Sequence, residues 1–132
     1  MEDIEKIYVN DVVIIAINLN RAILHEAVAF RKIVDDEIDS GQTNLVIDLS
    51  KCAYIDSTFF GAIIVGAKML INIGYKLKVV EPSIAGEYLF TYTNTVKVFD
   101  KYKTREDAIK SFEEDIQPDY PPYPLKRRGR GW

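Results

Sequence analysis

A short apolar run in the middle of the chain constrains the fold most. Leu45-Val46-Ile47-Asp48-Leu49 is almost continuously apolar, whereas a strand with one face in water alternates apolar and polar side chains. A strand of this kind is covered on both faces, as in sheets that carry crossover helices. We therefore interpret residues 45–49 as the central strand of an α/β domain.

Two strands and a helix are predicted before this run. The segments around 4–8 and 12–17 are rich in apolar and β-branched residues and flank Asn10-Asp11, residues that suit a tight hairpin turn. Residues 21–38 predict an amphipathic helix, because apolar residues recur there at helical spacing. The residues expected on its buried face are Leu24, Ala27, Val28, Val34 and Ile38.

Further helices and strands alternate after the central strand. Residues 57–73 predict a helix that ends at Gly74, residues 77–80 a strand, and residues 83–92 a short helix. An extended piece begins at Val96, and Thr104-Arg105-Glu106-Asp107 resembles a capping box that starts a last helix ending near Asp115. The order predicts a mixed sheet of about four or five strands packed with about four helices.

Composition divides the chain into a body and a tail. The 132 residues, 48% of them hydrophobic, suffice for one domain, which we place at residues 1–116. Residues 117–132 contain four prolines and carry a net charge of +3, which leaves −6 on the body out of the total of −3. We expect this tail to be extended or disordered and dispensable for folding. An acidic body argues against direct binding to DNA.

The sequence also predicts a cytoplasmic location. Cys52 is the single cysteine, whereas a small secreted domain usually carries several in disulfides. The acidic start of the chain lacks the basic and apolar stretches of a signal peptide, and no apolar run approaches the roughly 20 residues that span a bilayer. We therefore expect neither export nor membrane insertion.

Residues that could carry catalysis have simpler explanations. No phosphate-binding glycine loop, paired-cysteine motif or His-x-x-x-His pair is present, so we expect no cofactor and no metal. His25 and Cys52 have no evident reaction partner. Asp48 and Asp56 lie at the expected carboxyl edge of the sheet, where acid–base chemistry is possible, but we favour an electrostatic role near a helix start. Ser57 could cap the helix that follows it.

Two segments around these residues resemble the STAS domain family, named for sulphate transporters and anti-sigma factor antagonists. Val46-Ile47-Asp48-Leu49-Ser50 and Tyr54-Ile55-Asp56-Ser57-Thr58-Phe59-Phe60-Gly61 are similar to the family's Asp-Leu-Ser and Ile-Asp-Ser-Ser/Thr-Gly-Leu-Gly motifs. Gly74 to Val80 and Thr93 to Phe99 extend the similarity, which covers about residues 4 to 115.

The resemblance implies a regulatory binding protein, not an enzyme. In bacterial anti-sigma factor antagonists the serine after the motif aspartate is phosphorylated, and Ser57 occupies that position, with Thr58 as a secondary site. The implied partners are an anti-sigma factor that is also a serine kinase, and a phosphatase. The expected binding residues are Asp56, Ser57, Thr58, Phe59 and Phe60, on a monomer or weak dimer.

Two departures from the family pattern bear on partner choice. Phe59 and Phe60 replace the Gly-Leu pair, and we expect one of them to pack in the core and the other to anchor a partner at the surface. Asn18-Leu19-Asn20-Arg21 lacks the glycine and aspartate that often end the second strand in the family.

Two other functions are compatible with parts of the pattern. Related STAS domains act as scaffold components of large sensory assemblies or as accessory subunits of membrane lipid transporters. A phosphoacceptor receiver, the nearest enzymatic form, needs an early acidic pair at a strand end, which Asn18-Leu19-Asn20 does not offer. The scaffold or accessory function is therefore the alternative to the antagonist.

Overall fold

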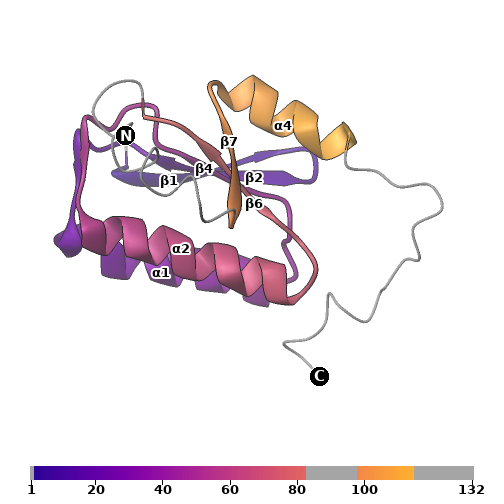
Figure 1. The fold of residues 1–132 in the computed structure, drawn as a ribbon, viewed down its shortest axis with the longest axis horizontal. Helices are drawn as coiled ribbons and strands as arrows, with labels where there is room; N and C mark the ends of the chain where they lie inside the picture. Colours follow the sequence, from indigo (N-terminus) through magenta and orange to yellow (C-terminus); the bar gives the residue numbers. More distant parts are fainter. Residues whose placement is uncertain (1, 83–97, 115–132) are drawn as a thin grey trace.

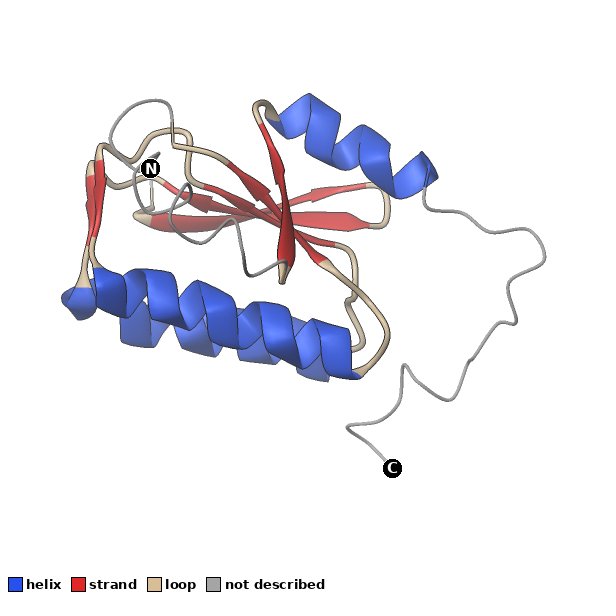
Figure 2. Cartoon of the chain, in the orientation of Figure 1, coloured by secondary structure: helices blue, strands red, loops and turns tan. Residues whose placement is uncertain are grey.

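A computed structural model describes residues 2–82 and 98–114 of the protein. These residues form a five-stranded sheet with helices on both faces, seen nearly edge-on in Figures 1 and 2. The elements, in chain order, are β1 (Ile4–Val9), β2 (Val12–Ile17), β3 (Arg21–Ala22), α1 (Leu24–Asp39), β4 (Leu45–Asp48), β5 (Tyr54–Ile55), α2 (Ser57–Asn72), β6 (Leu77–Val80), β7 (Phe99–Tyr102) and α4 (Arg105–Glu114).

The sheet is mixed, as the sequence predicts. Its strand order is β1-β2-β4-β6-β7, with β1 antiparallel to β2 and the other neighbouring pairs parallel. Asn10 has a φ of 57° in the β1–β2 turn, a left-handed conformation that asparagine tolerates well. Every residue of β4 is buried, which confirms its prediction as the central strand.

Helices α1 and α2 lie side by side on one face of the sheet, and α4 lies on the other (Figure 1). Phe30 of α1 and Phe59 of α2 meet with their ring centroids 4.8 Å apart. A Cβ added at Gly66 of α2 would stand 3.2 Å from a methyl group of Val34, so glycine lets the two helices approach closely. These contacts make α1 and α2 one packed layer.

The start and the phase of the first helix differ from the prediction. Arg21 and Ala22 form the short strand β3, and α1 begins only at Leu24. Ala27, Val34 and Ile38 are buried as expected, and Phe30 joins them, but Leu24 and Val28 are exposed. Three of the five residues expected on the buried face are therefore buried, and the other two lie on the exposed side of the first turns of α1.

Three helices are present in the described residues, against about four predicted. The helix predicted for residues 83–92 lies outside the described residues, as does the tail. The last strand, β7, begins at Phe99, and the expected start of the extended piece at Val96 lies outside the described residues. The capping prediction for α4 is confirmed, because Thr104 Oγ1 accepts a hydrogen bond from Asp107 N at 3.0 Å. Within residues 2–82 and 98–114, no helix has the length and apolarity needed to cross a bilayer.

Candidate functional site

The candidate site lies where two strand-to-helix turns run side by side. Strands β3 and β5 pair in parallel, which aligns Arg21 with Tyr54 and Ala22 with Ile55. The carbonyl oxygen of Asn20 accepts hydrogen bonds from the amides of Ala53 at 2.8 Å and Tyr54 at 3.0 Å. Helices α1 and α2 therefore begin next to each other, at positions fixed by backbone contacts.

Asp56 joins the two helix starts through its carboxylate. Its Oδ1 accepts a hydrogen bond from Phe59 N at 2.8 Å, which makes Asp56 the N-cap of α2. Its Oδ2 accepts a hydrogen bond from Leu24 N, the first residue of α1, at 2.9 Å. One negative charge thus serves the amino ends of two helices, where backbone amides favour an anion. These contacts are those of the electrostatic role near a helix start that the sequence favours for Asp56.

Ser57 and Thr58 are the first two residues of α2, and both are exposed. The capping role that the sequence allowed for Ser57 falls to Asp56 instead. The Ser57 hydroxyl therefore lies at the surface, directly after a capped turn and at the positive end of a helix dipole. A group attached to this hydroxyl would face solvent or a docked partner.

The expectation that Phe59 or Phe60 would be an exposed anchor is wrong. The side chain of Phe59 is 0% exposed and that of Phe60 is 7% exposed. Phe59 packs on Phe30, while Phe60 meets Phe99 edge-on with ring centroids 6.3 Å apart. Both positions of the first turn point into the helix–sheet interface because a residue that follows Asp56 by three or four lies on the inner side of α2. The pair cannot act as a surface anchor in this conformation.

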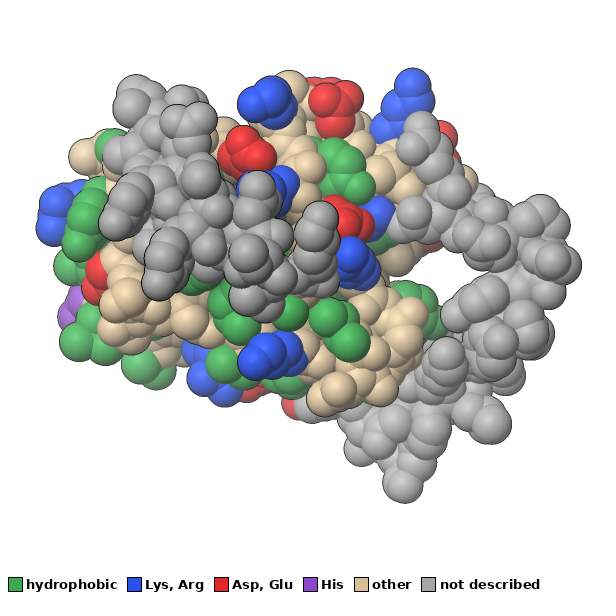
Figure 3. Space-filling view, in the orientation of Figure 1, with side chains coloured by type: hydrophobic (Ala, Val, Ile, Leu, Met, Phe, Trp, Pro, Cys, Tyr) green, Lys and Arg blue, Asp and Glu red, His purple; other side chains and the backbone are tan. Residues whose placement is uncertain are grey.

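Other apolar side chains are exposed close to Ser57. Leu24, Val28 and Tyr54 are 61%, 73% and 44% exposed, and we call these three residues the α1 patch. Leu24 and Val28 are one helical turn apart, and the guanidinium of Arg21 lies 4.6 Å from the ring centroid of Tyr54. Figure 3 shows hydrophobic side chains at the end of the molecule where the two helices begin. Sequence reasoning missed this patch because it assigned Leu24 and Val28 to the core.

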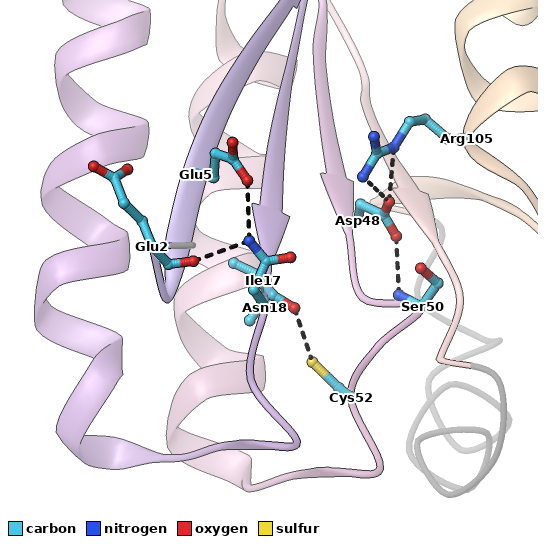
Figure 4. A network of polar contacts seen from close by, with 8 residues as sticks. All are labelled: Glu2, Glu5, Ile17, Asn18, Asp48, Ser50, Cys52 and Arg105. Atoms are coloured by element: carbon cyan, nitrogen blue, oxygen red, sulfur yellow. Dashed lines mark hydrogen bonds and ion pairs between the residues drawn. The ribbon is translucent and has the colours of Figure 1, made fainter.

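Asp48 belongs to a separate network at the end of β4 (Figure 4). Its Oδ2 accepts a hydrogen bond from Arg105 Nε at 2.9 Å and forms an ion pair with Nη2 of the same guanidinium at 2.8 Å. Its Oδ1 accepts a hydrogen bond from Ser50 N at 2.9 Å. Asp48 is buried, so this ion pair ties the start of α4 to the central strand. Asp48 and Asp56 have different partners, and each has a structural role.

Cys52 and His25 also fit structural roles. Burial and the nearby Asp48 carboxylate raise the pKa of the Cys52 thiol to about 12, so it is protonated at neutral pH. Its Sγ lies 3.8 Å from the carbonyl oxygen of Ile17 (Figure 4). His25 is exposed in the first turn of α1. Within the described part of the chain, no three His, Cys, Asp or Glu side chains gather as a metal site would require.

Comparisons with known proteins agree with this architecture. The family model described as "STAS domain" matches residues 4–108. An anti-sigma factor antagonist from Mycobacterium paratuberculosis shares 19% identity, with a TM-score of 0.75 over 83% of this chain and 92% of that one. The phosphorylated form of SpoIIAA, a Bacillus cell fate determinant, shares 17% identity, with a TM-score of 0.66 over 83% and 98% of the two chains.

A third solved structure gives the same result. An anti-sigma-factor antagonist (STAS) domain protein from Planctomyces limnophilus shares 20% identity, with a TM-score of 0.67 over 84% of this chain and 98% of that one. No curated protein sequence matches the chain significantly. At these identities the structural likenesses show the fold, and the family model, which matches most of the chain, shows the family. The chain belongs to the STAS domain family.

Proposed function

We propose that the protein is an anti-sigma factor antagonist, and that phosphorylation of Ser57 releases it from an anti-sigma factor that is also a serine kinase. The observation that carries this proposal is the exposed Ser57 at the first position of α2, directly after the doubly hydrogen-bonded Asp56. A serine phosphatase would restore binding. The protein acts in this proposal as a cytoplasmic monomer or weak dimer without enzymatic activity of its own.

The fold tolerates a phosphate at this position. Phosphorylation adds a charge of about −1.5 to −2, and backbone amides at a helix start stabilise such an anion. Asp56 directs both carboxylate oxygens to the amides of Leu24 and Phe59, so its own charge is partly compensated before the phosphate arrives. We therefore expect the phosphorylated domain to keep its structure.

A docked partner would respond differently to the modification. It covers Ser57 in the complex and would have to desolvate the phosphate beside the negative charge of Asp56. Each loss of about 1.4 kcal/mol weakens the affinity tenfold, so a penalty of a few kcal/mol releases the partner. The switch in this proposal is electrostatic and steric, and it requires no rearrangement of α2.

The α1 patch supplies the apolar contact area that Phe59 and Phe60 do not. The backbone amide of Leu24 donates a hydrogen bond to Asp56, the residue before Ser57. Leu24 and Ser57 therefore lie at the same end of the α1/α2 layer. Protein interfaces commonly have an apolar centre that excludes water and a polar rim. The α1 patch would form such a centre, with Ser57 beside it. We place the partner over Ser57, Thr58 and this patch.

Titration of the kinase partner with unmodified and phosphorylated protein tests the switch. We expect phosphorylation to weaken binding at least a hundredfold, Ser57→Ala to bind constitutively, and Ser57→Asp to bind poorly. Thr58→Val is the matched control, because Thr58 is also exposed in the first turn of α2. Modification of Thr58 alone, or equal affinity of both forms, would reject the antagonist function.

The alternative is a scaffold or accessory subunit of a sensory or lipid-transport assembly. The exposure of Leu24 and Val28 is the observation that favours it, because contacts with other subunits would also bury these side chains. Sedimentation of the protein from its native lysate separates the two functions. An antagonist sediments as a small species with one or two partners, whereas a scaffold subunit sediments in a large assembly.

A further inference from the structure

A groove lies at the end of the molecule opposite Ser57, and no part of the proposed switch uses it. It has a volume of about 810 Å³, within the range of about 300–1,000 Å³ typical of binding pockets. Its walls come from the β1–β2 turn, the start of β4, the segment that follows α2, the start of β7 and the last turns of α4. The groove is therefore bordered by one end of the sheet and by the C-terminal ends of α2 and α4.

The groove combines an apolar floor with an acidic rim. Ile71, Tyr75, Ile109 and Phe112 supply aliphatic and aromatic surface, and Ile71 is 42% exposed although it lies on a helix of the core. The charged lining residues are Asp11, Asp100, Glu113 and Lys76. Lys76 Nζ lies 3.1 Å from Asp100 Oδ1, so the charges of this ion pair cancel. The remaining charges of the rim are the negative charges of Asp11 and Glu113.

The C-terminal tail, residues 117–132, has the complementary composition. Its first half alternates prolines with Tyr120 and Tyr123, and its second half holds Lys126, Arg127, Arg128 and Arg130. Proline-rich segments bind grooves lined by aromatic side chains, because their extended conformation costs little ordering entropy. Basic side chains that follow such a segment would meet an acidic rim.

Helix α4, which precedes the tail in the chain, ends at the groove. Glu113, a lining residue, lies in the last turn of α4, which ends at Glu114. Only residues 115 and 116 separate this end from Gln117, and the three steps along the chain from Glu114 to Gln117 span at most about 11 Å. Attachment at the rim gives the tail a local concentration in the millimolar range, so even weak binding is populated.

We propose that the tail, residues 117–132, docks in the groove between α4 and the C-terminal end of α2, with its Pro-Tyr segment on Ile71, Tyr75 and Phe112 and its basic residues near Asp11 and Glu113. This docking is independent of Ser57 and of the antagonist function. It occupies the end of the molecule away from the α1 patch, so the tail and a partner at Ser57 bind without competition.

A spin label on the tail of the full-length protein tests this placement. Gly129→Cys provides the attachment site, and Cys52 does not react because it is buried and protonated at neutral pH. We expect the label to broaden the amide NMR signals of Ile71, Gly74 and Tyr75 far more than those of Leu24 and Val28. Raising the salt from about 0.05 M to about 0.5 M shortens the Debye length roughly threefold and should reduce the broadening.

Two variants separate docking from mere attachment nearby. Ile71→Ser removes an exposed apolar side chain from the groove floor, and we expect it to reduce the broadening at Gly74 and Tyr75 by at least half. Val65→Ser is the matched control, since Val65 is 38% exposed on the same helix and does not line the groove. Equal broadening in both variants, or stronger broadening at Leu24 than at Tyr75, would overturn the proposal.

Discussion

The two faces of the sheet are held to their helices in different ways. On the α1/α2 face, β2, β4 and β6 direct Ile15, Ile47 and Val79 into a large apolar core that includes Phe30 and Phe59. On the α4 face, the buried apolar cluster is small. Polar anchors supplement it there, namely the Asp48–Arg105 ion pair and the buried Lys78, whose Nζ lies 4.6 Å from the ring centroid of Phe112.

This difference indicates where the molecule is rigid and where it opens first. Apolar burial stabilises by about 25 cal/mol per Å², so the larger core makes the α1/α2 layer the more stable unit. Ser57 is the first residue of α2 and so belongs to that layer, and the proposed switch would need such a fixed surface with and without a phosphate. Helix α4 depends on a few directional contacts, and we expect it to unfold locally at lower free energy.

Removal of an aromatic ring from the larger core should have the greatest effect. Phe59→Ala should lower the free energy of unfolding by about 3–5 kcal/mol, because the ring is fully buried and stacks on Phe30. Urea denaturation measures this loss. Phe59→Leu, which keeps most of the apolar volume, should lose much less. A loss below about 1 kcal/mol for Phe59→Ala would show that the α1/α2 face is not the stronger one.

Loss of the ion pair on the α4 face should come next. Arg105→Met leaves the buried Asp48 carboxylate with only the hydrogen bond from Ser50 N among its described partners, which should cost about 1–3 kcal/mol. Lys103→Met is the matched control, because Lys103 is highly exposed and lies 3.9 Å from Glu81, where ion pairs contribute little. Native-state hydrogen exchange should show faster opening of α4 while α1 and α2 keep their protection.

Thr104 tests the same face with a smaller change. Thr104→Ala removes the cap on Asp107 N and should cost about 1 kcal/mol, whereas Thr104→Ser keeps an oxygen at the cap position and should cost little. Thermal unfolding of both variants measures the difference. If the two variants melt together, the cap does not contribute and α4 is held by its other contacts alone.

The sequence predicts the central strand, helix α2 and the first hairpin well because each depends on local pattern. The apolar run at 45–49 predicts a buried strand, and residues 57–73 predict a helix whose observed bounds are Ser57–Asn72. Both patterns follow from burial on one or two faces of a regular element, which repeats in the sequence. Asn10-Asp11 likewise predicts the hairpin turn because backbone conformation restricts residue type there.

The candidate site was harder to predict because it depends on contacts between distant segments. The contact of Asp56 with Leu24 N joins residues 32 positions apart, and no local pattern indicates it. The pairing of Arg21 with Tyr54 is similarly non-local and involves strands of only two residues, too short to show alternation. Leu24 and Val28 follow helical periodicity, yet periodicity gives a face without saying what covers it.

The exposed Val28 gives the smallest expected change in stability and the sharpest test of what the outer surface of the α1/α2 layer does. Val28→Ser should change the free energy of unfolding by less than about 0.5 kcal/mol, because the side chain is 73% exposed and the two residues have similar helix propensities. If the partner covers the α1 patch, the same change should weaken its binding about tenfold, since an apolar contact at an interface centre is lost. Val65→Ser, on the outer side of α2, should weaken binding much less, and both variants should be measured by calorimetric titration with the partner. If both variants lost the same binding affinity, the partner would contact the whole outer surface of the α1/α2 layer. Undiminished binding in Val28→Ser would instead confine the interface to the start of α2 around Ser57.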